Sequence, residues 1–234
     1  MSDLNIFKNW SFEDCSELTD RKEILNKLSI AEAVHITELQ DVNTMIKIGL
    51  IYHEVALNLN RFAPKKDRRT GYAEKSFQVL SKLVAKPILS KEIQIWILTY
   101  QASSLALLSG EKGSLILLSR AFSLFEIAIA KYDQESYLPR FLRASVSENL
   151  PWLFWRKRKF AKLDLDNLVK RIEDNPSAIP DKIKSFIYWA WANQFKNKIN
   201  KRQVVKKHLR ESIRLDPEKK AGFLNAEKLL IKLE

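Results

Sequence analysis

A histidine next to a glutamate is the first pair of residues in this sequence that could perform chemistry. His53-Glu54 begins the pattern His-Glu-x-x-His, in which two histidines one helical turn apart bind zinc and the glutamate acts as a general base. The position of the second histidine is occupied by Leu57. We therefore expect neither a metal ion nor a cofactor at this pair.

The sequence also gives no indication of covalent catalysis or of phosphate binding. Cys15 is the only cysteine, and no histidine close to it in the sequence would activate its thiol as a nucleophile. The five glycines are scattered, so they form neither a phosphate-binding loop nor the Gly-x-Ser-x-Gly turn of hydrolases. We expect a protein without catalytic activity. An enzyme of unknown type is the alternative, with no set of residues that indicates its reaction.

Two carboxylates follow a pair of arginines in the middle of the chain. Asp164 and Asp166 are two positions apart, so on one helix they point in different directions, and near a helix start they would interact favourably with the helix dipole. Arg140 and Arg143 are spaced i, i+3, which places both on one face of the preceding helix. We expect Asp164 to pair with these arginines and to hold two helices together.

An aromatic cluster at residues 152–155 is followed directly by four basic residues. Rings beside positive charge are typical of surfaces that bind single-stranded nucleic acid, because bases stack on the rings and phosphates pair with the cations. The structural alternative is that the rings fill the space between two helical hairpins and the basic run is the exposed first turn of the next helix. The candidate partner-binding residues of this corner are Trp155, Arg156, Lys157, Arg158 and Lys159.

Helices must position these residues. Apolar residues recur with a period near 3.6, no segment reads as a strand, and glycine and proline are scarce, with 5 and 7 of 234 residues. Typical N-cap residues precede three of the segments: Thr19 or Asp20 before the first, Ser90 before the second and Ser114 before the third. The predicted helices span about 20–34, 41–60, 73–86, 91–109, 114–128, 134–148, 158–174, 180–198, 201–215 and 218–233.

Three places in the chain carry a recurring two-helix pattern. Near the carboxyl end the pattern consists of Trp189, Ala192, Val205, Leu209, Ser212 and Pro217. In the middle it consists of Ala121, Phe125 and Ala128, and early in the chain of Met45, Ile48, Gly49 and Tyr52, followed by Ala73, Phe77 and Leu80. These residues resemble the tetratricopeptide repeat, in which small residues lie where two helices touch. The resemblance implies an all-α fold of stacked helical hairpins, a TPR-like α-solenoid of about ten helices.

Residues 95–175 are also similar to a widespread set of uncharacterised bacterial tetratricopeptide-like proteins. The similarity is carried by Arg140-Phe141-Leu142-Arg143, Glu148-Asn149-Leu150-Pro151, Phe154 and Asp164-Leu165. It implies a fold and no activity. We expect one tetratricopeptide-like helical domain over residues 1–234, with an acidic leader at 1–40, three or more irregular hairpins at 41–217 and a capping helix at 218–234. The concave face of such a domain binds a protein or peptide, and His53, Gln194 and Asn197 would lie on it.

The net charge of +12 is distributed unevenly. Residues 1–60 hold 5 basic and 10 acidic residues, whereas residues 61–234 hold 35 and 18. A basic body favours an acidic protein or peptide as partner, and nucleic acid is the alternative; a merely solvated lysine-rich surface is a third reading. No run of about 18 apolar residues occurs and the first ten residues lack the pattern of a secretory signal, so we expect a cytoplasmic protein.

Overall fold

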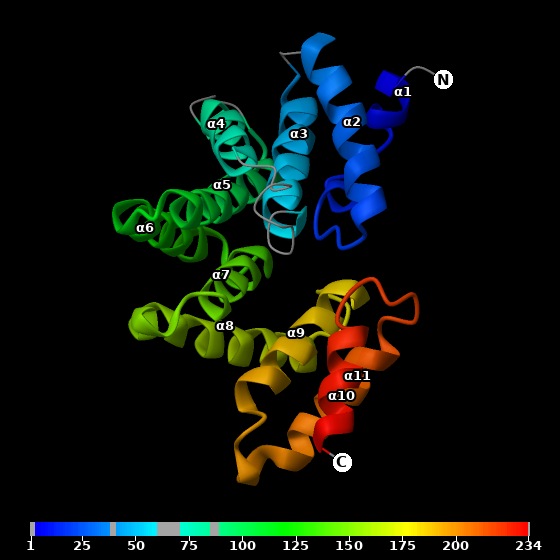
Figure 1. Cartoon of the computed structure of the whole chain (residues 1–234), viewed down its shortest axis with the longest axis vertical. Coiled ribbons are helices and arrows are strands. Elements are labelled where there is room, and N and C mark those ends of the chain that lie inside the picture. Colours follow the sequence, from blue (N-terminus) through cyan, green and yellow to red (C-terminus); the bar gives the residue numbers. More distant parts are fainter. Residues whose placement is uncertain (1–2, 38–40, 60–70, 85–88, 234) are drawn as a thin grey trace. The chain divides into compact units, whose positions relative to one another are not determined.

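The computed structural model of the chain describes residues 3–37, 41–59, 71–84 and 89–233. Within these residues the chain forms eleven α-helices and no strand (Figure 1), which confirms the all-α prediction. The contacts divide the chain into two compact units, Met1–Pro139 (unit 1) and Arg140–Glu234 (unit 2).

In unit 1, helices that follow one another along the chain pack against one another. Its elements are α1 (Asp3–Lys8), the 3-10 turn η1 (Glu13–Cys15), α2 (Arg21–Thr37), α3 (Val42–Glu54), the π-helical turn η2 (Val55–Leu59), α4 (Tyr72–Val84), α5 (Lys91–Lys112) and α6 (Leu115–Tyr132). α1 packs on α2, α2 on α3, α3 on both α4 and α5, α4 on α5, and α5 on α6. Such pairing of neighbours agrees with helical hairpins, whereas a tetratricopeptide-like solenoid stays a prediction.

Local sequence signals explain where several of these helices begin and end. Asp20 Oδ1, Ser90 Oγ and Ser114 Oγ each accept a hydrogen bond from the backbone N–H three residues later, at 2.8, 3.3 and 3.4 Å. The predicted caps Ser90 and Ser114 are therefore confirmed, and of the two alternatives Thr19 and Asp20, the cap is Asp20. The prediction that the helix beginning at Lys91 ends near Gly110 is wrong, because α5 continues to Lys112 and stops at Gly113, whose φ of 62° is left-handed.

The core of unit 1 surrounds α3, whose residues from Thr44 to Glu54 are all buried. α4 lies so close to α3 that a Cβ atom at Gly49 would come within 2.8 Å of the Leu80 side chain. Ser76 Oγ donates a hydrogen bond to the Gly49 carbonyl at 2.7 Å. Gly49 is the small residue that the repeat pattern predicts at a contact between two helices, and it lies at such a contact.

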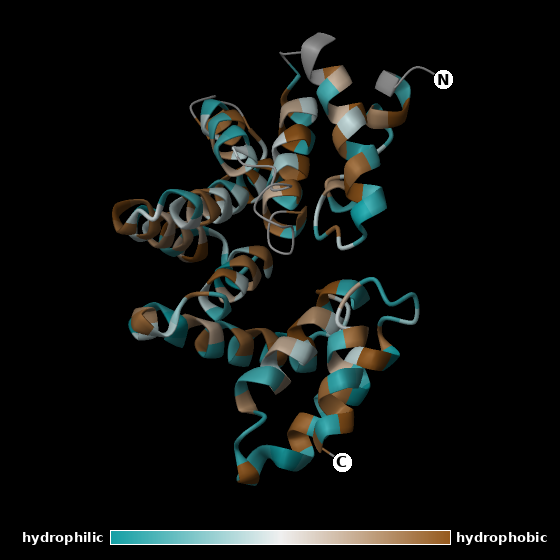
Figure 2. Ribbon diagram, in the orientation of Figure 1, coloured by the Kyte–Doolittle hydropathy of each residue, from teal (hydrophilic) through white to brown (hydrophobic). Residues whose placement is uncertain are grey.

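Unit 2 is built in the same way. Its elements are α7 (Leu138–Glu148, whose first two residues belong to unit 1), the 3-10 turn η4 (Trp152–Phe154), α8 (Trp155–Asp174), α9 (Asp181–Phe195), the 3-10 turn η5 (Ile199–Lys201), α10 (Arg202–Arg214) and α11 (Phe223–Leu233). α8 packs on α9, α9 on α10, and α11 on both α10 and α9. In Figure 2, apolar and polar positions alternate around these helices, as expected when each buries one side against its neighbours.

Two helices of unit 2 begin at other places than predicted. α8 begins at Trp155 and not at residue 158, so the basic run forms its first turn. α11 begins at Phe223 and not at residue 218, because the Asp216 carboxylate accepts hydrogen bonds from the N–H groups of Lys220, Ala221 and Phe223. These bonds stabilise a turn where the sequence pattern predicts helix.

A buried carboxylate joins α7 to α8. Asp164 is 0% exposed, and its two oxygens accept hydrogen bonds from Arg143 Nε and Nη2, both at 2.7 Å, while Oδ1 also accepts from Arg140 Nη1 at 2.9 Å. The predicted arginine–aspartate pairing is confirmed. The expectation that Asp164 and Asp166 lie near a helix start is wrong, since both lie in the middle of α8. Asp166 instead accepts from the indole N–H of Trp191 at 2.7 Å.

We predict that Asp164→Ala lowers the free energy of unfolding by about 3 kcal/mol, because Arg143 is left with a buried charge and no carboxylate. Urea unfolding followed by tryptophan fluorescence measures this, since four of the six tryptophans belong to unit 2. Glu218→Ala is the control: Glu218 pairs with Lys220 and both are exposed. If both variants unfold at the wild-type urea concentration, the pairing does not stabilise the unit.

Candidate functional site

The aromatic–basic corner lies on the surface of unit 2. Trp152, Leu153 and Trp155 are 80, 55 and 52% exposed. The reading in which this cluster fills a space between hairpins is therefore wrong for these three side chains. Three large apolar side chains exposed side by side are characteristic of interaction surfaces. We call the following exposed residues the aromatic–basic patch: Trp152, Leu153, Trp155, Arg156, Arg158 and Lys159. Lys157, which was also predicted, is half-buried and is not included.

Positive charge is held close to the exposed rings. Arg156 and Lys159 lie over the Trp155 ring, 5.3 and 4.5 Å from its centroid. Arg158 Nη1 donates a hydrogen bond to the Leu150 carbonyl at 2.7 Å, which fixes its side chain beside the turn η4. The patch thus combines apolar contact area with cations of defined position.

The start of α8 is electrostatically unfavourable for the helix itself. Its first turn holds no acidic residue, and its N-cap, Phe154, makes no side-chain cap. Because a helix N-terminus carries a partial positive charge, basic residues there oppose helix stability. Asp164 and Asp166, the first acidic residues of α8, are bonded elsewhere in unit 2 and do not neutralise this turn. A negatively charged partner would relieve this repulsion.

The net charge of the chain belongs to unit 2. Unit 1 holds 17 basic and 17 acidic residues, whereas unit 2 holds 23 and 11, a net charge of +12. The sequence shows a change in charge balance at residue 60, whereas the boundary between the two structural units lies after Pro139. The patch belongs to the unit that carries the whole excess of positive charge.

The other predicted contact residues do not form one site with the patch. Gln194 is half-buried near the end of α9, and Asn197 is exposed just after it. Among the described residues, no hydrogen bond or ring contact joins either of them to the patch. His53 belongs to unit 1 and is 0% exposed, so it cannot contact a partner directly. The expectation that His53 faces a partner is corrected accordingly.

His53 is instead part of a buried chain of polar groups. Its Nδ1 lies 3.0 Å from Glu54 Oε1 and its Nε2 lies 2.8 Å from Ser103 Oγ. Serine, histidine and carboxylate are bonded in this order in many hydrolases. Here all three side chains are enclosed in the core, and Glu54 Oε2 also accepts from the Leu18 N–H at 3.0 Å. We assign this chain a structural role, because it ties α3 to α5 and to the segment before α2.

Two further titratable groups are also enclosed. Burial raises the pKa of the Cys15 thiol to about 12, which keeps it protonated and therefore a poor nucleophile at neutral pH. His208 of unit 2 stacks on Tyr188, with centroids 4.9 Å apart, and meets Trp191 edge-on at 4.6 Å. Its Nδ1 is buried without a hydrogen-bond partner. Burial, with a contribution from Lys207, lowers the pKa of His208 to about 4.

Neither a metal cluster nor a membrane span is found in the described part of the chain. No group of three or more His, Cys, Asp or Glu residues there could hold a metal ion. None of the described helices is both long and apolar enough to cross a membrane.

Comparisons with known proteins do not assign the chain to a family. No family model matches it. No curated protein and no solved structure is significantly similar to it either.

We predict that acid destabilises unit 2 through His208. In the folded protein His208 stays neutral down to about pH 4, whereas in the unfolded chain it binds a proton below about pH 6.5. Its contribution to stability is therefore complete above pH 6.5 and is lost as the pH falls toward 4, by up to about 3 kcal/mol. Urea unfolding at pH 4.5 and 7.0 measures the loss.

The control for this prediction is His208→Phe, which keeps an aromatic ring between Tyr188 and Trp191 but cannot bind a proton. The variant should lose less stability between the two pH values than the wild type, and the difference between the two losses is the effect of His208. Equal losses would mean that His208 does not carry the pH dependence.

Proposed function

We propose that the chain is a non-catalytic binding protein, a tetratricopeptide-like scaffold, whose aromatic–basic patch binds an acidic segment of a protein partner. The observation that carries the proposal is the exposure of Trp152, Leu153 and Trp155 beside Arg156 and Lys159. The neighbour-to-neighbour packing of helices within each unit supports the scaffold part of the proposal.

The apolar part of the patch favours a protein partner. Tryptophan and arginine are the residue types that contribute most binding energy at protein interfaces, where rings are buried in pockets of the partner. Leu153 adds apolar area that a protein can cover but on which a nucleic-acid base cannot stack. The Trp155 ring is already in contact with two cations, which makes it less available as a stacking platform.

The charge of unit 2 favours an acidic partner. An excess of +12 attracts negative surfaces over long range and raises the rate of encounter. The uncapped, basic first turn of α8 supplies short-range attraction for a carboxylate. Apolar residues would fix the partner in place, and acidic residues beside them would pair with Arg156, Arg158 and Lys159.

Single-stranded nucleic acid is the second candidate. Trp152 exposes most of its ring, and base stacking on an exposed ring next to cations is a common mode of binding. This candidate requires affinity that falls steeply with salt, because each phosphate contact releases a counterion. A protein partner held largely by Trp152 and Leu153 would be much less sensitive to salt.

We predict that a protein partner is retained by the immobilised chain from nuclease-treated lysate of the source cells and is lost with Trp152→Ala. Trp152 is so exposed that its removal should not disturb folding, while truncation of a central interface tryptophan weakens binding roughly thirtyfold, or about 2 kcal/mol. Quantitative mass spectrometry of the retained proteins gives the measurement.

The charge of the patch is tested with a matched pair of variants. Arg156→Gln/Lys159→Gln and Lys207→Gln/Arg210→Gln each remove one arginine and one lysine from unit 2, but only the first pair belongs to the patch. The first double variant should weaken retention and the second should not. Retention that disappears with nuclease, together with binding of a 20-nucleotide oligothymidylate that requires Trp152, would establish the nucleic-acid function instead.

A further inference from the structure

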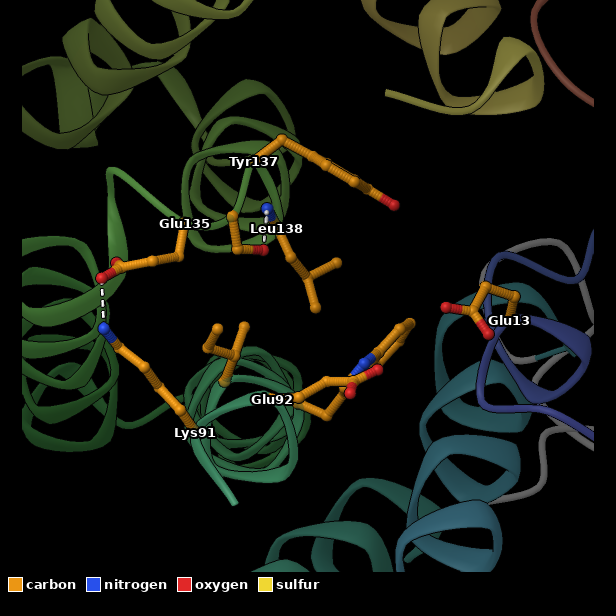
Figure 3. A pocket seen from close by; sticks show the side chains of 9 residues that line it. Glu13, Lys91, Glu92, Glu135, Tyr137 and Leu138 are labelled. Atoms are coloured by element: carbon orange, nitrogen blue, oxygen red, sulfur yellow. Dashed lines mark hydrogen bonds and ion pairs between the residues drawn. The ribbon is translucent and has the colours of Figure 1, made fainter. Parts of the chain in front are cut away.

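Unit 1 contains a cavity that is chemically the opposite of the patch. It has a volume of about 320 Å³ and is formed by the turn η1, the first turns of α5 and the chain that leads into α7. Glu13, Glu92, Tyr137 and Leu138 border one space from these different elements (Figure 3). Carboxylates lie at its edge, while Ile95, Trp96 and Leu138 form its apolar wall.

The charge of this cavity is negative. Of its three glutamates, only Glu135 is paired, with Lys91, the only cation among the residues that line it (Figure 3). The carboxylates of Glu13 and Glu92 have no cationic partner among the described residues. Burial, together with the nearby charges of Glu17 and Glu13, raises the pKa of the Tyr137 hydroxyl, which therefore stays neutral. A positive group in the cavity would find two carboxylates available.

A hydrogen-bond donor also borders the cavity. Trp96 is only 7% exposed, stacks on Tyr100 with centroids 5.7 Å apart, and contacts the Phe12 ring at the same distance. Among the described residues, no acceptor bonds its indole N–H, and this nitrogen is not one of the enclosed polar atoms of the protein. The indole N–H is therefore open to solvent at the cavity, where it can donate to an acceptor of a bound molecule.

The cavity adjoins a second hollow of about 380 Å³, and the two share Glu13 and Glu92. The second hollow is bordered by Trp10, Phe12 and Lys47. Lys47 Nζ donates to the carbonyls of Phe7 and Lys8 at 3.3 and 3.1 Å, so its charge is directed away from the hollow into the protein. Because the two hollows share Glu13 and Glu92, a peptide bound in one can continue into the other.

We propose that this acidic–aromatic cavity binds a basic peptide segment of a protein partner, with an arginine side chain between Glu13 and Glu92. A guanidinium group forms paired hydrogen bonds with carboxylates and stacks on aromatic rings, so it suits this wall better than an ammonium group does. The Trp96 N–H donates to a backbone carbonyl of the same peptide. This site lies in unit 1, requires the opposite charge in its ligand and is independent of the aromatic–basic patch.

The test uses the full chain labelled with ¹⁵N and a blocked peptide, acetyl-Gly-Gly-Arg-Gly-Gly-amide. Six tryptophans give six indole N–H signals in the NMR spectrum, and the signal missing in Trp96→Phe is that of Trp96. We expect this signal to move downfield on titration, because the N–H gains an acceptor. The same peptide with citrulline in place of arginine is nearly identical in shape but uncharged, and it should bind at least about tenfold more weakly.

Two variants decide the role of the carboxylates. Glu13→Gln/Glu92→Gln removes the two unpaired charges and should weaken arginine-peptide binding about tenfold or more, while Glu126→Gln/Glu227→Gln removes two other exposed glutamates and should leave it unchanged. All four positions are exposed, and circular dichroism confirms folding. Equal binding of the arginine and citrulline peptides, a Trp96 signal that does not move, or full binding by the first double variant would each overturn the proposal.

Discussion

The cost of burying a carboxylate is the constraint on which the packing within each unit depends. Glu54 in unit 1 and Asp164 in unit 2 are both fully enclosed, and a buried charge is tolerated only when its oxygens are paired and hydrogen-bonded. Asp164 satisfies this requirement with Arg140 and Arg143 from α7. Glu54 satisfies it with His53 and with the backbone before α2. In both units the carboxylate therefore determines which segments must lie together.

The same constraint separates structural from functional polar residues. His53 and Asp164 have the residue types of a catalytic site, but every strong hydrogen bond they make is directed to the protein itself. By contrast, Arg156 and Lys159 lie at the surface on an exposed ring, and Glu13 and Glu92 border a cavity without a cation between them. We propose a binding role for those charged side chains that, within the described residues, have no partner of opposite charge.

The two proposed surfaces differ in charge because the units differ in charge. Unit 1 is balanced, so a local excess of carboxylates can persist beside Trp96 without a long-range positive field from the rest of that unit. Unit 2 carries the entire net charge, and its exposed tryptophans lie within that field. A chain with two such surfaces has the means to contact an acidic and a basic segment, which is the behaviour expected of a scaffold.

Most of the helical architecture could be predicted from the sequence, because amphipathic periodicity and cap residues act over a few positions. The caps at Asp20, Ser90 and Ser114 are of this kind, as is the i, i+3 spacing that places Arg140 and Arg143 on one face of α7. Their pairing with Asp164, by contrast, joins residues 24 and 21 positions apart. The prediction is wrong where a side chain a few positions away competes with helical periodicity: Asp216 accepts hydrogen bonds from the N–H groups of Lys220, Ala221 and Phe223, so α11 begins later than its pattern predicts. The tetratricopeptide resemblance stays a prediction, since the pairing of neighbouring helices is compatible with other helical folds.

By itself, the sequence determined that the chain is helical, where most helices lie and that it is basic, because these properties depend on local spacing and on composition. Only the tertiary structure decided which polar residues are available to a partner. His53 is enclosed by Ser103, a residue 50 positions away, whereas Trp152 remains uncovered. Glu13, Trp96 and Tyr137, which are far apart in the chain, border one cavity. Burial arises from contacts between distant segments, and periodicity along one segment contains no information about them.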